Sequence, residues 1–84
     1  MPYIKQERRK EIDANVMMIC RNAGELNYKI TTLVRTFLTH TAMGENYASY
    51  NEAIGVLECA KLELYRRKVA LYEDKKIIEN GDVY

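Results

Sequence analysis

Cysteine, proline and tryptophan are scarce or missing in this 84-residue chain, which has two cysteines, one proline and no tryptophan. Two cysteines are too few for the disulfide scaffold of a small secreted domain. We therefore interpret Cys20 and Cys59 as reduced thiols of a cytoplasmic protein. The single proline, Pro2, leaves the rest of the chain free to form helices.

An excess of one charge and long apolar runs are also lacking. The formal net charge of +1 gives no bulk attraction to nucleic acid or to an anionic membrane. No apolar run approaches the roughly 20 residues that a membrane-spanning helix needs. We therefore expect no membrane partner, and the balanced charge argues against nucleic acid.

Catalytic and metal-binding motifs are missing as well. Cys20, His40 and Cys59 stand alone, without the paired spacing that holds zinc or the Cys–His neighbourhood that activates a thiol. No Glu-x-x-Glu pair is available for magnesium, and the glycines form no phosphate-binding loop. We predict a protein that is not an enzyme and has no metal or other cofactor.

The pattern that is present is the three- and four-residue spacing of helices. It predicts helices at about 6–22, 25–41 and 49–79. Gly24 separates the first two, because glycine readily adopts the left-handed conformation that ends a helix. The sequence SYNE at 49–52 has the form of a capping box. Residues 2–4 and 82–84 are expected to be short extended segments that lie near one another.

These elements predict an all-α fold, a three-helix domain over 1–84 made of a helical hairpin and an N-terminal helix. The third helix would be about 45 Å long at 1.5 Å per residue, longer than the other two can cover. We expect it either to bend near 69–72 or to project towards a partner chain. Because so short a chain has a thin core, we expect a homo-oligomer.

Gly55 is an unusual residue inside the third helix, since glycine there costs about 1 kcal/mol relative to alanine. With Cys59 one turn later it forms a stripe of small residues that another backbone can approach closely. That backbone belongs either to a helix of the same chain or to a second subunit. In the second interpretation, Gly55 and Cys59 mark an oligomer interface.

The sequence ELYRRKVALYEDKK at 63–76 places two tyrosines seven residues apart among cations. Bases stack on tyrosine rings, and phosphates pair with guanidinium groups. The same residues also suit an oligomer interface with long cations lying along it, or a solvated helix face balanced by its acids. The candidate ligand-binding residues are Tyr65, Arg66, Arg67, Tyr72, Lys75 and Lys76, with Tyr28 and Tyr84 as a further wall.

Four segments carry a resemblance: MPYIKQERR at the start, GELNY at 24–28, LECAKLELYRR at 57–67 and YEDKKIIENGDVY at 72–84. Together they resemble a family of small uncharacterised helical proteins from tailed bacteriophages and bacterial genomes. Members often carry proline at the position of Leu71, which favours a helix break before Tyr72, whereas Leu71 permits continuity. The resemblance implies a phage-type accessory protein in a bacterial cytoplasm and brings no established activity.

Phages encode small helical oligomers that sequester the nucleotide signals of bacterial immune systems. This chain is similar to them in size, helical content and lack of catalytic groups, which is a likeness of fold rather than of site. Our hypothesis is a non-catalytic binding protein that sequesters a nucleotide-like signal at a helix or subunit interface. The alternative is a protein-interaction module that inhibits or redirects a host protein through the same helix.

Overall fold

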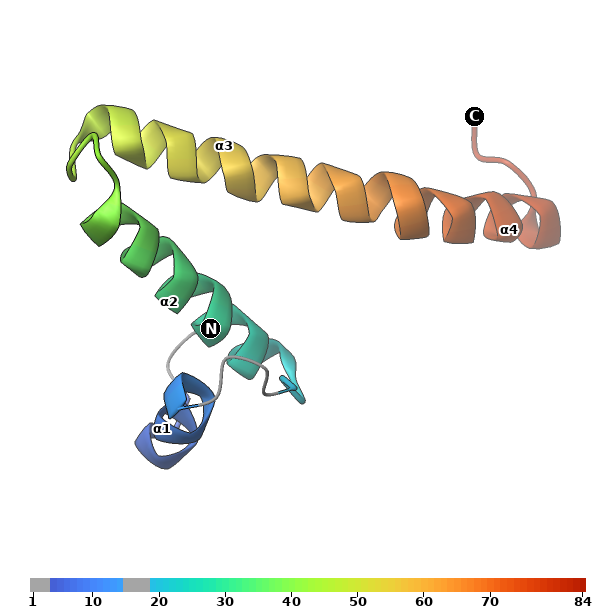
Figure 1. Ribbon diagram of the computed structural model, residues 1–84. Coiled ribbons are helices and arrows are strands. Elements are labelled where there is room, and N and C mark those ends of the chain that lie inside the picture. The colour runs from blue at the N-terminus through green and yellow to red at the C-terminus, as the bar shows by residue number, and fades with distance from the viewer. Residues whose placement is uncertain (1–3, 15–18) are drawn as a thin grey trace. The chain divides into compact units, whose positions relative to one another are not determined.

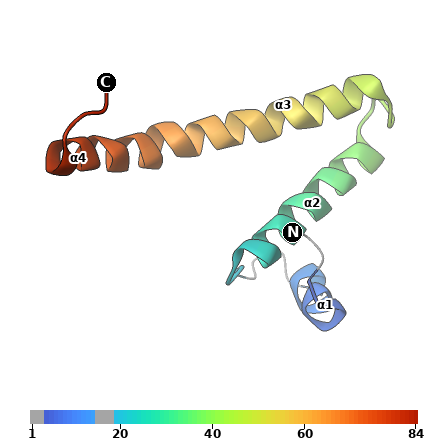
Figure 2. The same ribbon diagram turned by 180° about the vertical axis from the view of Figure 1, so that it is seen from behind.

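A computed structural model describes residues 4–14 and 19–84, and within these ranges the chain is all-helical and has no strand (Figure 1). The elements are α1 (Gln6–Ala14), α2 (Ala23–His40), α3 (Tyr47–Leu64), the π-helical turn η1 (Tyr65–Val69) and α4 (Ala70–Asn80). The last three follow one another without a break and form one long helix, as both views show (Figures 1 and 2). The all-α class is thereby confirmed.

The chain divides into two compact units, Met1–Ser49 and Tyr50–Tyr84. Unit 1 contains α1 and α2. Unit 2 contains most of α3, with η1, α4 and a short C-terminal tail. The tail at 81–84 is non-helical but forms no strand, and of the expected extended N-terminal segment only Ile4 lies among the described residues. A single domain over 1–84 stays a prediction.

The prediction that the first helix reaches residue 22 and ends at Gly24 is wrong. Helix α1 is described over Gln6–Ala14, residues 19–22 are non-helical, and Gly24 lies in the first turn of α2. The residue that decides this boundary is Asn22. Its side chain accepts a hydrogen bond of 2.9 Å from the backbone N–H of Glu25 and so caps the start of α2.

The capping box of α3 involves Asn46 and Ser49, three residues earlier than SYNE suggested. The Asn46 side chain accepts a hydrogen bond of 3.1 Å from the Ser49 backbone N–H, and the Ser49 hydroxyl accepts one of 2.9 Å from the Asn46 backbone N–H. This reciprocal pair satisfies two donors that a helix start would leave without partners. Helices α2 and α3 therefore begin with the same device, an asparagine cap bonded to the third helical residue.

Few apolar side chains are buried in the part of the chain that the structure describes. Ile12 and Ala53 are its only buried hydrophobic residues. Much of the expected stripe of α2 is exposed, including Leu26, Leu33 and Phe37. Hydrophobic burial within the described residues is therefore too small to be the main stabilising term.

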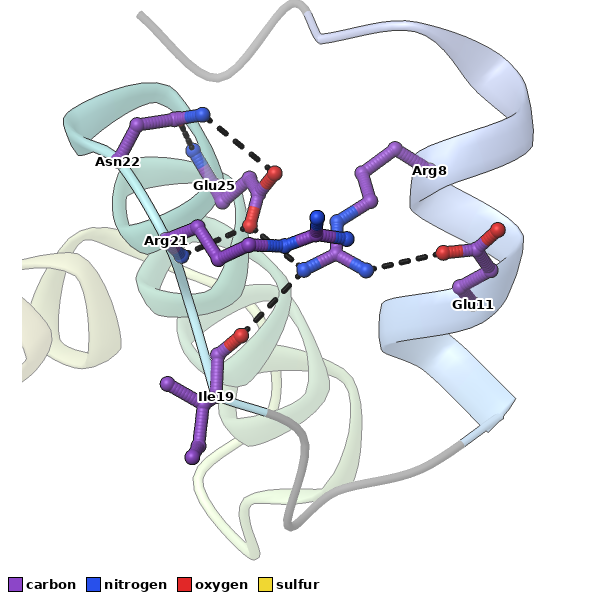
Figure 3. A network of polar contacts seen from close by, with 6 residues as sticks. All are labelled: Arg8, Glu11, Ile19, Arg21, Asn22 and Glu25. Carbon is purple, nitrogen blue, oxygen red and sulfur yellow. Dashed lines mark hydrogen bonds and ion pairs between the residues drawn. The ribbon is translucent and has the colours of Figure 1, made fainter.

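Unit 1 is held together by a polar network that joins α1 to α2, shown in Figure 3. The Arg8 guanidinium donates hydrogen bonds to the carboxylates of Glu25 (2.7 Å) and Glu11 (2.9 Å) and to the carbonyl of Ile19 (3.3 Å). Glu25 also accepts a bond of 2.9 Å from the backbone N–H of Arg21. One guanidinium thus ties α1 to α2 and to the segment that precedes it.

The ion pair between Arg8 and Glu25 is almost completely shielded, with side chains 12% and 8% exposed. The hydrogen bond from Arg8, followed by that from the Arg21 backbone, lowers the pKa of Glu25 from 4.5 to about 2. The same pairing raises the pKa of Arg8, so both groups stay charged at neutral pH. A shielded pair stabilises when further hydrogen bonds satisfy its remaining donors and acceptors, and the contacts to Glu11, Ile19 and Arg21 supply several of these bonds.

A second contact between α1 and α2 involves Tyr28. Its hydroxyl donates a hydrogen bond of 2.5 Å to Asp13, which raises the pKa of Tyr28. The Arg9 guanidinium lies over the tyrosine ring, 5.8 Å from its centroid. The motifs QERR and GELNY therefore contact each other through two residue pairs, Arg8–Glu25 and Arg9–Tyr28.

Candidate functional site

Six of the eight candidate ligand-binding residues lie on the π turn and the helix that follows it. We call them the π-turn surface: Tyr65, Arg66 and Arg67 in η1, and Tyr72, Lys75 and Lys76 in α4. All six are exposed. They lie in unit 2, on the long helix that Figure 2 shows from behind.

The π turn is defined by a hydrogen bond from the Ala70 backbone N–H to the Tyr65 carbonyl, five residues back instead of four. Such a turn holds one residue more than an α-helical turn. In an α-helix, residues eight apart differ by about 80° around the axis, and the extra residue removes most of that difference. Accordingly, the Tyr65 hydroxyl donates a hydrogen bond to the Glu73 carboxylate, which raises the pKa of Tyr65.

The same shift redirects the apolar stripe of the long helix. Tyr50, Leu57 and Leu64 follow one another at seven-residue spacing along one face of α3. Past the π turn, the next position on this face comes eight residues later, at Tyr72, rather than seven later at Leu71. Leu64 and Tyr72 are 59% and 60% exposed, so the stripe is open on both sides of the turn.

The two arginines of the π turn share one carboxylate, that of Glu63. Its oxygen lies 3.0 Å from Nη2 of Arg66 and 2.5 Å from Nε of Arg67. Both guanidinium groups are about two-thirds exposed, so these pairs add little stability. They do fix two guanidinium groups beside each other, and a phosphate group would have to compete with Glu63 for both.

Tyr72 and Lys76 form a second pair one turn apart on α4. The Lys76 ammonium lies 5.5 Å from the centroid of the Tyr72 ring and 3.1 Å from the Glu79 carboxylate. An ammonium group over a tyrosine ring is a favourable cation–π arrangement. The structure thus brings together Tyr72 with Lys76, and Arg66 with Arg67.

A shallow groove of about 450 Å³ lies between α4 and the C-terminal tail. The chain leaves α4 at Gly81, where φ is 88°, a conformation that glycine adopts more easily than other residues. Of the candidate residues, Lys76 and Tyr84 line the groove, and Tyr72 and Lys75 do not. The lining residues are Ala70, Glu73, Asp74, Lys76, Ile77, Asn80, Gly81, Asp82, Val83 and Tyr84.

The remaining candidate residues lie apart from this surface in the chain. Tyr28 belongs to unit 1, where Asp13 and Arg9 engage its hydroxyl and its ring. A Cβ added at Gly55 would meet no atom within 4 Å, which gives no support to close packing of a helix of the same chain. Cys59 is exposed. An intersubunit role of Gly55 and Cys59 stays a prediction.

Sequence reasoning missed Arg8 and Glu25, the most shielded ion pair in the described ranges. The available signal was the spacing of Asn22 and Glu25, which is typical of a helix start with an acid at its third position. Within 4–14 and 19–84, no group of three or more His, Cys, Asp or Glu side chains could hold a metal ion. No helix of the same ranges is long and apolar enough to cross a membrane.

A protein-family model matches nearly all of this chain. The family described as "Domain of unknown function (DUF6899)" matches residues 1–83, nearly the whole chain. No curated protein matches, and no solved structure matches. The match is therefore to a family of uncharacterised proteins, and it indicates no function.

Proposed function

The chain belongs to the DUF6899 family, and we propose that it is a non-catalytic protein that binds a nucleotide-like small molecule and sequesters it at a helix or subunit interface. One observation carries the proposal: a π turn, a rare feature that occurs often at functional sites, coincides with the cluster of tyrosines and arginines. The resemblance to phage proteins adds the setting, an accessory protein in the cytoplasm of a bacterial host.

Each part of the π-turn surface suits a different part of a nucleotide. The Tyr72 ring, 60% exposed, offers a plane on which a base can stack, a contact worth about 1–3 kcal/mol. Arg66 and Arg67 offer two neighbouring guanidinium groups for phosphate oxygens. The groove lined by Lys76 and Tyr84 falls within the size range of small-molecule sites. Tyr28 is left out of the proposed site because it belongs to unit 1, where it contributes to the contact between α1 and α2.

Calorimetric titration with cyclic dinucleotides and with ADP-ribose tests the proposal. We expect at least one of them to bind with a Kd below about 100 μM. Replacing both arginines (Arg66→Ala with Arg67→Ala) should weaken binding by at least about tenfold, a loss of about 1.4 kcal/mol. Replacing Lys10 and Arg35 by alanine is the matched control, since it removes the same charge from exposed positions of α1 and α2.

Glu63→Gln should change the ligand affinity in the opposite direction. It removes the carboxylate that both arginines contact, so a phosphate ligand should bind more tightly. No binding of any tested nucleotide would contradict the proposal, and so would equal affinities of the arginine double variant and its control.

The alternative function is a protein-interaction module that inhibits or redirects a host protein. The observation that favours it is the apolar stripe, because exposed apolar surface bordered by charges is typical of protein-binding faces. Affinity purification from a bacterial lysate separates the two functions. Sequestration predicts that a heat-stable small molecule is released on denaturation. The alternative predicts a bound host polypeptide, and Leu57→Lys should abolish its binding.

A further inference from the structure

We infer that the long helix of unit 2 pairs with the same helix of a second copy in antiparallel orientation, with the two-fold axis at the π turn. This goes beyond the proposed function, because the pairing does not require a ligand. The interface on each copy is the unit 2 stripe, which consists of Tyr50, Ile54, Leu57, Leu64, Val69 and Tyr72.

The first reason is that unit 2 holds no second element that could cover this stripe. Between Tyr50 and Asn80 the unit is one helix, followed only by a four-residue tail. Ile54, Leu57 and Leu64 are 66%, 40% and 59% exposed. A single helix is only marginally stable in water, and helices in proteins gain most of their stability from packing an apolar face.

The second reason is the continuity of the stripe. Without the π turn, the α3 face would continue at Leu71 and Ile78. With it, the face continues at Val69 and Tyr72. Lys76 follows on the same face and already lies over the Tyr72 ring, so its apolar stem adds to the surface. The result is one face that runs the length of the helix, about 46 Å at 1.5 Å per residue.

The charge distribution selects the second copy as the occupant and fixes its orientation. Residues 50–64 carry three acids and one base, a net charge of −2, whereas residues 66–80 carry five bases and three acids, a net charge of +2. A parallel pair would set like charges against each other. An antiparallel pair sets each acidic half against a basic half, which favours association and excludes the wrong orientation.

The sign changes between Glu63 and Arg66, so the two-fold axis falls near Tyr65, midway between Tyr50 and Asn80. In this register Ile54 lies opposite the partner's Lys76, and Glu58 lies opposite the partner's Tyr72. Glu58 is then one turn from the partner's Lys76, and Lys61 is one turn from the partner's Glu73. The pairing also brings the π turns of both copies together, so a ligand site there would draw on two chains.

Light scattering on the full chain is the first test. We expect twice the chain mass at high micromolar concentration and a loss of helical signal from unit 2 on dilution. Leu57→Lys should give the monomer mass. Leu62→Lys is the matched control, because it makes the same change on the same helix about 140° away from Leu57, and it should leave the mass unchanged. A monomeric wild-type chain, or a trimer or larger assembly, would overturn the inference.

Cross-linking tests the orientation. In a background with Cys20→Ser and Cys59→Ser, chains with Ile54→Cys and chains with Lys76→Cys are mixed and treated with a short bismaleimide. An antiparallel pair yields mainly the mixed 54–76 product. A parallel pair would yield 54–54 and 76–76 products, and that outcome would overturn the orientation even for a dimer. Neither readout involves a nucleotide, so failure of this pairing and failure of ligand binding are separate results.

Discussion

The two units of this chain are stabilised in opposite ways. Unit 1 joins two helices through shielded charges, with Arg8 and Glu25 at the centre and almost no solvent contact. Unit 2 is one helix whose ion pairs are exposed and whose large apolar side chains are exposed as well. The difference indicates that contacts between its own helices hold unit 1 together, whereas the stability of unit 2 depends on what covers its stripe.

Glu25→Gln should have the largest effect on this comparison. It removes the carboxylate that accepts bonds from Arg8 and from the Arg21 backbone, and it leaves a shielded guanidinium without its main partner. We expect loss of hydrogen-exchange protection in α1 and a lower Tm, with the exchange of α3 and α4 unchanged.

The control for this variant is Glu11→Gln, which removes another carboxylate bonded to Arg8. Glu11 is 57% exposed, and exposed pairs contribute little, so its Tm should stay close to that of the wild type. If the two variants lower the Tm equally, the shielding of Glu25 does not contribute to stability.

Acid should weaken unit 1 in a defined pH range. The pKa of Glu25 is about 2 in the folded chain against an ordinary value of 4.5. A lowered carboxyl pKa contributes stability that is fully present above pH 4.5 and is lost as the pH falls from 4.5 towards 2. Chemical denaturation across this range, followed through α1, should show the loss. The profile should be flatter in Glu25→Gln, and an equally steep profile there would rule out Glu25 as the titrating group.

The helix caps should give intermediate effects. Asn22→Ala and Asn46→Ala each remove a side chain that accepts a bond from the third helical residue, at an expected cost of about 1 kcal/mol each. Asn51→Ala, an exposed position inside α3, is the control and should be neutral or slightly stabilising. Denaturant midpoints measure all three, and a neutral Asn22→Ala would contradict its role as the cap of α2.

Tyr65→Phe should have the smallest effect, confined to the π turn. It removes the hydroxyl that bonds to Glu73 across the turn and keeps the ring. We expect faster hydrogen exchange of the Ala70 amide, which donates to the Tyr65 carbonyl, with no change in Tm. Tyr72→Phe keeps the ring that Lys76 contacts and should leave the Ala70 amide unchanged. If both variants behave alike, the Tyr65–Glu73 bond does not support the turn.

Helix periodicity predicted the elements better than their ends. The second helix was expected at about 25–41 and lies at Ala23–His40, and the long helix was expected to reach about 79 and ends at Asn80. The boundary between α1 and α2 differs from the prediction because Asn22, and not Gly24, marks it. Glycine and asparagine both occur at helix boundaries, but glycine indicates where a helix ends and asparagine indicates where the next one begins.

The π turn had no local signal in the sequence. YRRKV contains good helix formers, and nothing in their order distinguishes a hydrogen bond to the fifth preceding residue from one to the fourth. The bend expected near 69–72 came from the length of the helix rather than from these residues. The structure has in its place an uninterrupted helix with one wide turn at Tyr65–Val69.

The sequence alone determined the helical class and the apolar spacing along the two long helices, and it predicted residues that suit an anionic, stackable ligand. These follow from spacing and side-chain chemistry, which are local properties. Only the three-dimensional structure decided that Arg8 and Glu25, 17 residues apart, form a shielded pair, and that the long helix contains a wide turn at Tyr65–Val69. Those facts depend on how helices meet and how the backbone turns, and neither is encoded in periodicity.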